Sequence, residues 1–439
     1  MSEDIYQALS RTALLLERDI FATADHRPIV DGLRATTARI IANRANTDSV
    51  AGQTALVTLY AQLAMMGLQV DLDIPTIDLV LGQPPLRGDD LEAALVDFSE
   101  DLPPGGSSRP AAVPDITFAL GDTPALPTSV RVSGTAWQAS VAQVGQAGAW
   151  RGTMPVGAMA AGAAAAADGL RVALPRIAER LERPTPVEAA FVLDPSRQVS
   201  VDLSDFSVSG PVRLGEVDVI SGGAITNAAL YALRRIPDVS ARMRVLEPDA
   251  LDLTNLNRYP VARRSQVGML KAELLQTLSA EGFQVTGLPV RFDETTLPFI
   301  GALAPRVLVG VDHIPSRWCV QVAAYDRWVC VGASSHFYVL VSAHPIGRPC
   351  AGCVHPRDDS TLGNIPTISF VSFWAGLIQA LEVLREVAGT PKAVTTSTNV
   401  WPLGLDGRRG IQAVTQSAVA ECPTQCRASR ARRRQIVGV

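Results

Sequence analysis

The chain has 439 residues, of which 47% are hydrophobic and 19% charged, and its formal net charge is -4. This composition allows a large buried core and excludes a mainly disordered chain, and the slightly acidic balance argues against a nucleic-acid-binding protein. The length predicts two to three domains.

The N-terminal segment lacks the basic region, apolar core and cleavage site of a signal peptide. The most apolar stretch, residues 159–174, is alanine-rich and interrupted by charged side chains, so it predicts a buried helix rather than a membrane span. We therefore expect a cytoplasmic protein without membrane contacts. In that reducing compartment the six cysteines indicate metal binding or chemistry rather than disulfides.

The first part of the chain, residues 1–205, contains no cysteine and gives few clear signals. Its span 83–127 is rich in proline and glycine, which predicts loops with short strands at most. The elements expected here are helices over 53–66 and 155–181, a strand over 68–75, and short strands over 116–120 and 129–132.

The second part, residues 206–439, alternates regularly between strand and helix patterns. Strands are expected over 216–220, 241–247, 283–292, 306–312, 328–334 and 337–343, and helices over 225–235, 267–281, 314–324 and 369–387. This alternation predicts an α/β fold with a Rossmann-like, doubly wound, mainly parallel sheet.

The turn after the first of these strands is a candidate phosphate loop. Strand, glycine turn and helix together direct backbone N–H groups toward phosphate. Gly222 and Gly223 are present, but Ser221 and Thr226 occupy the outer positions of the G-x-G-x-x-G pattern. An ordinary tight turn explains this segment equally well. Glu247, at the end of the next strand, fits the ribose of a dehydrogenase cofactor as well as that of ATP.

The segment that follows favours a triphosphate. Asn255, Arg258 and Lys271 lie close in sequence to the phosphate loop, and Lys271 stands early in a helix, where the dipole also favours anions. A nicotinamide cofactor does not need two such fixed positive charges. A triphosphate that loses pyrophosphate does, because negative charge builds up on the leaving group.

At these positions the chain resembles the ThiF/MoeB/HesA family, which includes the ubiquitin-activating enzymes. The family motifs D-x-D, N-L-x-R-Q, G-x-x-K and D-N-x-x-x-R match Glu247 to Asp249, Asn255 to Tyr259, Gly268 to Lys271 and Asp312 to Arg317. Glu replaces the first Asp of D-x-D, Tyr replaces the Gln of N-L-x-R-Q, and His replaces the Asn of D-N-x-x-x-R. The later strand pair, cysteine turn and long helix follow in the family's order, so the resemblance covers about residues 210–430.

The resemblance implies an adenylation domain that binds ATP and Mg²⁺. Glu247, with Asp249 in the same motif, would hold the ribose, and Asn255, Arg258 and Lys271 would hold the phosphates. Asp312 would bind Mg²⁺, so that Arg258, Lys271 and Asp312 are the expected catalytic residues. Independently, an aspartate at the carboxyl end of a parallel strand faces the ligand crevice, and Mg²⁺ prefers such carboxylates. The alternative for Asp312 is a helix N-cap.

Two cysteine pairs predict a structural Zn²⁺ site. Cys350 and Cys353 form one short-spaced pair, and Cys422 and Cys426 form another about 70 residues later. Four thiolates in this arrangement suit a tetrahedral zinc ion.

The other two cysteines, Cys319 and Cys330, are expected to pack in the core. The link 355–370 contains no cysteine, whereas the resemblance would place a thioester-forming cysteine in that region. The adenylate is therefore expected to react directly with another acceptor, or with a thiol supplied by a conjugating partner.

Residues 1–205 are interpreted either as an inactive, degenerate adenylation half or as an unrelated substrate-recognition domain. Neither N-L-x-R nor G-x-x-K occurs in them, so this half is not expected to bind ATP. Arg11 or Arg18 is a candidate for an arginine that reaches the ATP of the second half, with ordinary packing as the alternative for each.

The leading hypothesis is an activating enzyme that adenylates the C-terminal carboxylate of a ubiquitin-like protein, in a bacterial-type conjugation or sulfur-carrier pathway. A second is adenylation of a ribosomal peptide during antibiotic maturation, in which case the partner is a peptide substrate. The altered glycine loop and Tyr259 keep open a catalytically inactive binding module, and a dehydrogenase is a fourth alternative. No membrane or nucleic-acid partner is expected.

Overall fold

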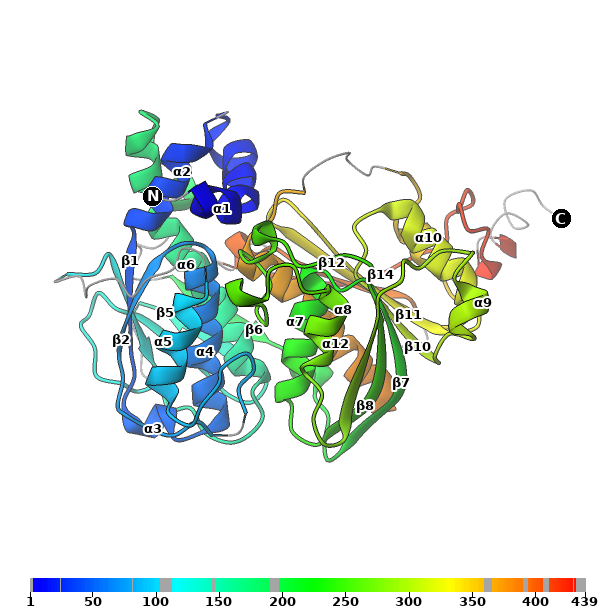
Figure 1. Ribbon diagram of the computed structural model, residues 1–439, viewed down its shortest axis with the longest axis horizontal. Helices are drawn as coiled ribbons and strands as arrows, with labels where there is room; N and C mark the ends of the chain where they lie inside the picture. Colours follow the sequence, from blue (N-terminus) through cyan, green and yellow to red (C-terminus); the bar gives the residue numbers. More distant parts are fainter. Residues whose placement is uncertain are drawn as a thin grey trace.

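The computed structural model describes residues 3–23, 25–80, 82–102, 113–143, 147–189, 197–358, 365–389, 394–405, 410–428 and 430–431. Two lobes lie side by side, each built around one sheet (Figure 1). No helix in these ranges is long and apolar enough to cross a membrane.

The sheet of the first lobe has six strands in the order β2-β1-β3-β4-β5-β6. Its first four strands are parallel, and β5 and β6 join in antiparallel fashion. The strands are β1 (Thr37–Ile41), β2 (Gln69–Asp73), β3 (Ile116–Leu120), β4 (Val130–Gly134), β5 (Gln138–Ala142) and β6 (Gln198–Asp202). Here the sequence predicted only β2, β3 and most of β4.

The sheet of the second lobe has eight strands in the order β14-β13-β12-β11-β10-β7-β8-β9. Strands β9, β8, β7, β10 and β11 are parallel, and the rest are antiparallel. This confirms the predicted Rossmann-like, mainly parallel α/β fold. The strands are β7 (Val212–Ile220), β8 (Val239–Leu246), β9 (Phe283–Leu288), β10 (Arg306–Val309), β11 (Trp328–Ser335), β12 (Tyr338–His344), β13 (Thr396–Val400) and β14 (Ile411–Thr415).

The two sheets repeat one topology. The order β2-β1-β3-β4-β5-β6 corresponds, strand by strand and direction by direction, to β8-β7-β10-β11-β12-β13. Helix α4 (Val50–Met65) follows β1 as α7 (Ala224–Arg235) follows β7. Helix α6 (Val156–Arg180) comes between β5 and β6, as α12 (Ser369–Val387) comes between β12 and β13.

These four helices pack between the strands of the two lobes (Figure 1). Every residue of α4 is buried, and residues 159–171 of α6 are also buried, which confirms the predicted buried helix. Small side chains allow this close approach, because a Cβ on Gly162 would lie 3.0 Å from the backbone nitrogen of Leu59. One hydrophobic core therefore runs through both lobes.

Further helices complete each lobe. In the first lobe they are α1 (Glu3–Leu16), η1 (Glu17–Phe21), α2 (His26–Ala35), α3 (Arg44–Thr47), α5 (Leu91–Glu100) and η3 (Ser204–Phe206). In the second they are η4 (Leu253–Asn255), η5 (Arg264–Gln266), α8 (Lys271–Gln276), α9 (Leu297–Ile300), α10 (Ile314–Ala323), α11 (Ala351–Val354) and η6 (Pro402–Gly404).

Two predictions from the sequence are wrong in their bounds. The helix expected over 267–281 is only α8, because Gly268 has a φ of +94° and Leu270 is extended. The span 83–127 is not all loop and strand, because it contains α5. Asp90 caps α5 by accepting a hydrogen bond from the Ala93 nitrogen. Burial of one face of α5 outweighs the tendency of the surrounding proline and glycine residues to form loops.

Candidate nucleotide-binding site

A cavity of about 600 Å³ opens at the carboxyl ends of β7, β8 and β10. The strand order reverses at β7, and ligands of doubly wound sheets bind at such a reversal. The polar lining residues are Arg11, Ser221, Glu247, Asp249, Asn255, Arg258, Tyr259, Lys271, Arg291, Asp293, Asp312, His313, Ser316, Ser334, Thr367 and Ser372. Of the nucleotide-site residues predicted from the sequence, all but Gly222 line this cavity.

The phosphate loop is shaped by close packing against the next strand. A Cβ on Gly222 would lie 2.9 Å from Cγ of Glu247, so this position requires glycine. Ser221 has a φ of +88°, in the region that favours glycine, which is the residue of the motif at this position. Its hydroxyl accepts a hydrogen bond from the Gly223 nitrogen at 3.1 Å. Ser221 therefore adopts the left-handed conformation that the glycine of the motif would allow, and its hydroxyl is used within the loop.

Glu247 joins this loop to the loop after β8. Its Oε2 accepts hydrogen bonds from the Gly222 nitrogen at 2.7 Å and from the Ser221 hydroxyl at 3.3 Å, and its Oε1 accepts one from the Asp249 nitrogen at 3.0 Å. The side chain is buried. It thus has a structural role in addition to the ribose contact expected from the sequence, which stays a prediction.

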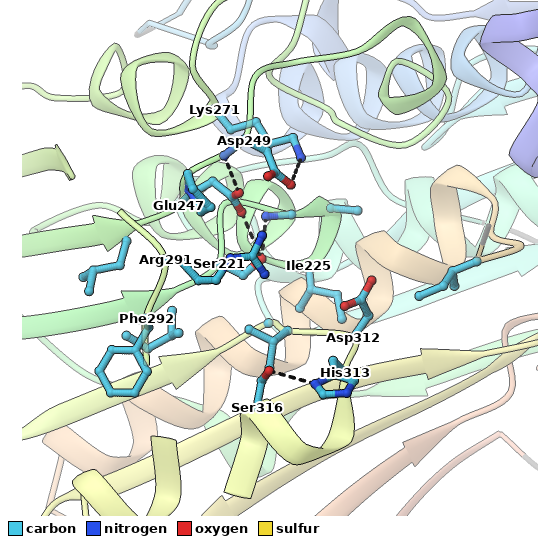
Figure 2. A pocket seen from close by; sticks show the side chains of 18 of the residues that line it. Ser221, Ile225, Glu247, Asp249, Lys271, Arg291, Phe292, Asp312, His313 and Ser316 are labelled. Atoms are coloured by element: carbon cyan, nitrogen blue, oxygen red, sulfur yellow. Dashed lines mark hydrogen bonds and ion pairs between the residues drawn. The ribbon is translucent and has the colours of Figure 1, made fainter. Parts of the chain in front are cut away.

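Lys271 and Asp249 form an ion pair at one end of the cavity (Figure 2), with Nζ 3.2 Å from Oδ2. Burial disfavours the charged lysine, but Tyr259 and the carboxylates of Glu247 and Asp249 outweigh it and raise the pKa of Lys271. The ammonium group therefore stays charged where an anion would bind.

Arg258 is held rigidly by its own loop. Its Nη1 donates to the backbone oxygen of Thr254 and, at 2.7 Å, to Oδ1 of Asn257. Burial lowers the pKa of Arg258, and this marks a guanidinium with little solvent around it. Asn255 caps its own turn, because its Oδ1 accepts from the Asp252 nitrogen at 2.9 Å.

Asn257 was not singled out from the sequence, although it lies inside the N-L-x-R motif. Its Nδ2 donates to Oγ1 of Thr12 at 2.8 Å and to the backbone oxygen of Thr367 at 3.2 Å. Through Arg258 on one side and Thr12 on the other, it links the cavity to helix α1 of the first lobe.

Helix α1 brings Arg11 into the cavity lining. The Nε atom of Arg11 is buried and has no hydrogen-bond partner among the described residues. Burial lowers the pKa of Arg11, against the opposing charges of Asp252 and Asp312. Arg18, the other candidate, instead contacts Asp19 at 3.0 Å and His336 at 3.1 Å, away from the described lining.

Asp312 lies across the cavity from Lys271, with Ser221 between them in Figure 2. Helix α10 begins at Ile314 with His313 as its N-cap residue and no side-chain cap, so Asp312 does not have the capping role considered from the sequence. Its side chain is exposed to the cavity. Three buried or half-buried cations and a nearby carboxylate are the groups that a Mg²⁺-bound polyphosphate requires.

The four predicted zinc ligands come together. Their sulfur atoms lie within 4.8 Å of one another, with 3.9 Å between Cys350 and Cys353, 3.4 Å between Cys350 and Cys422, and 3.6 Å between Cys353 and Cys426. Tetrahedral zinc places its sulfur ligands about 3.8 Å apart, so this donor set fits Zn²⁺. The identity of the metal stays a prediction.

The other two cysteines differ. Cys330 is fully buried in β11, as expected. Cys319 does not pack in the core as predicted, because it is only half-buried and lines the cavity from α10. Burial raises the pKa of the Cys319 thiol, and so do the nearby acids Glu294 and Asp293, which makes it a poor nucleophile.

Replacing Cys422 with serine is expected to abolish binding of one zinc per chain and to destabilise the second lobe. Structural zinc contributes on the order of 10 kcal/mol in small domains. Metal analysis and thermal unfolding check this, with Cys319→Ser as the matched control that should retain the metal. A wild-type protein purified without a bound transition metal would contradict the prediction.

Comparisons with known proteins give only remote similarities. No protein-family model matches the chain. The uncharacterized protein y4jF of Sinorhizobium fredii is 28% identical over 242 residues, which cover 52% of this chain and 44% of that protein. This chain thus spans less than half of that relative's length.

Two solved structures of MccB are similar over about half of this chain. E. coli MccB with MccA has a TM-score of 0.39 and 14% identity, covering 48% of this chain and 66% of that one. The microcin C7 biosynthetic enzyme MccB in complex with N-formylated MccA has a TM-score of 0.39 and 16% identity, covering 49% and 67%. At this distance they assign no activity to this chain.

Proposed function

We propose that the chain is an ATP-dependent adenylyltransferase that activates a carboxylate as an acyl-adenylate. A carboxylate oxygen attacks the α-phosphorus of ATP, the bond from that phosphorus to the bridging oxygen breaks, and pyrophosphate leaves. The observation that carries the proposal is the convergence of Arg11, Arg258 and Lys271 on one cavity that Asp312 also lines. This charge pattern suits a leaving pyrophosphate with its magnesium ion.

Each residue has a role in this proposal. Arg258 and Lys271 neutralise the charge that develops on the leaving group, and Asp312 would hold a magnesium ion, which would supply further positive charge to the phosphates. Glu247 meets the ribose while it holds the phosphate loop in place. The buried Nε of Arg11 gains a phosphate oxygen as its partner.

Because Arg11 comes from the first lobe of the same chain, one chain supplies every charged group of this site. The proposal therefore needs no second subunit to complete the nucleotide site.

The first lobe is proposed to be the inactive half of an internally repeated fold. Asp122 follows β3 as Asp312 follows β10, but the space beside it is occupied. The buried Asn46 donates from Nδ2 to Oδ1 of Asp122 at 2.8 Å and to Oγ1 of Thr123 at 3.1 Å, and its Oδ1 accepts from the Trp150 nitrogen at 2.9 Å. These contacts tie the Asp122 carboxylate to side chains of the first lobe itself.

The carboxylate donor is proposed to be the C-terminus of a ubiquitin-like protein, with a ribosomal peptide as the second candidate. The second is favoured by one observation. The link 355–370 lacks cysteine, and the Cys319 thiol in the cavity has a raised pKa, so the described residues offer no good thioester nucleophile. An acyl group on AMP would then pass directly to its acceptor.

ATP–pyrophosphate exchange tests the proposal. Exchange that depends on an added ubiquitin-like protein, or on a peptide with a free C-terminus, supports adenylation and identifies the donor class. Amidation of that C-terminus provides the matched control, because it removes the nucleophile and should abolish exchange. Tight Mg·ATP binding without exchange for any carboxylate would favour an inactive binding module, and lack of ATP binding would contradict the proposal.

A further inference from the structure

The four-cysteine site is joined to helix α10 by three contacts. The Ala351 nitrogen donates to Oε1 of Gln321 at 3.0 Å, and Nε1 of Trp318 donates to the backbone oxygen of His355 at 2.8 Å. Nη1 of Arg317 lies 3.4 Å from Nε2 of His355, which accepts because a guanidinium can only donate. Ala351 lies between the first two cysteines, and His355 follows them.

Arg317 continues this connection to the nucleotide cavity. Its Nε donates to the backbone oxygen of Val311 at 3.0 Å, and its Nη2 to that of Asp312 at 3.3 Å. The Arg317 side chain is 7% exposed, so few water molecules can replace these partners. One planar guanidinium therefore contacts His355 on one side and the backbone that carries Asp312 on the other.

We propose that His355 and Arg317 are positioning residues through which the loaded four-cysteine site fixes the place of Asp312 in the nucleotide cavity. The inference rests on the proposed function, in which Asp312 binds the magnesium of ATP. A bound metal fixes the turn of Cys350 and Cys353, the turn fixes His355, and His355 orients Arg317. Loss of the metal frees the turn and allows the loop at Asp312 to shift, so the state of the thiols controls nucleotide binding.

The main test uses His355→Ala, which leaves all four cysteines in place. We expect the full-length variant to retain its zinc and to bind Mg·ATP about tenfold more weakly in calorimetry, the usual effect of removing a partner that orients a metal ligand. Trp318→Phe removes only the indole donor to His355 and should weaken binding less. His26→Ala, an exposed histidine on the first lobe, is the matched control.

Removal of zinc by a chelator is the second half of the test. In the wild type, chelation should weaken Mg·ATP binding and change the tryptophan emission, and Trp318→Phe should lose most of that emission change. In His355→Ala, chelation should weaken binding by a further factor of less than about two, because the connection is already cut.

Three results separate the possibilities. If chelation weakened Mg·ATP binding equally in wild type and His355→Ala, the proposed connection through His355 and Arg317 would be overturned. A His355→Ala variant that binds Mg·ATP as tightly as the wild type would also overturn this connection. The proposed adenylation activity of the wild type would not be affected by that result. A wild-type protein that binds no Mg·ATP would overturn the proposed function and this connection together.

Discussion

Replacing Asp312 with asparagine is expected to reduce Mg·ATP binding sharply and to lower pyrophosphate exchange on the order of 100-fold or more. The asparagine keeps the size of the side chain but removes the negative charge that faces the cavity. Magnesium binds carboxylates far better than amides, so the phosphates lose their counter-ion. Calorimetry with and without Mg²⁺ separates the loss of magnesium binding from any direct effect on ATP binding. The affinity for ATP alone should change much less.

Asp326→Asn is the matched control. Asp326 lies just beyond the C-terminal end of α10. Among the ion pairs of the described residues, its carboxylate contacts only the neighbouring Arg327, whose Nη1 lies 2.9 Å away. Its replacement should leave both Mg·ATP binding and exchange near wild type. If both aspartate variants bound Mg·ATP equally well, the magnesium role of Asp312 would have to be abandoned.

Arg11→Ala should lower the rate of adenylation by about 100- to 1,000-fold while the fold stays intact. The guanidinium enters the cavity from α1, and its Nε has no partner there among the described residues. No hydrogen bond of that nitrogen is therefore lost from the free protein. The variant should unfold at nearly the wild-type temperature and fail mainly in single-turnover formation of the acyl-adenylate.

Arg18→Ala tests the alternative on the same stretch of chain. It removes the contacts with Asp19 and His336 but leaves the cavity lining unchanged, so adenylation should stay within about twofold of wild type, the usual range for exposed pairs. Mixing Arg11→Ala with Lys271→Ala chains adds a second check. Activity that returned on mixing would mean that Arg11 acts on a neighbouring chain, contrary to the single-chain site proposed above.

The convergence of the candidate nucleotide-site residues on one cavity could be predicted from the sequence because they occupy consecutive loops after strands. Once the strand–helix alternation is recognised, parallel pairing brings the ends of β7, β8 and β10 to one edge, and the motif residues converge there. The cysteine pairs were recognisable for a similar reason, since zinc geometry relates short spacings to a single centre.

Other features depend on contacts between distant segments. The choice between Arg11 and Arg18 depends on how α1 packs against Asn257, which no local pattern reveals. The strands of the first lobe are only five residues long, which leaves each with few positions in which an alternating pattern could be recognised. Asn257 itself looked like a spacer within a motif, whereas its Nδ2 donates to Thr12 of the first lobe as well as to Thr367 of the second.

The continuous core between the lobes restricts how the protein can move. Thr58 of α4 and Tyr231 of α7 share a hydrogen bond of 3.0 Å between their hydroxyl groups, and the Ser369 hydroxyl at the start of α12 donates to the backbone oxygen of Gln62 at 3.0 Å. Close-packed interiors resist sliding and hinge bending. The two lobes should therefore behave as one rigid body. Slow amide exchange should then extend without a break from α4 and α6 across the interface to α7 and α12.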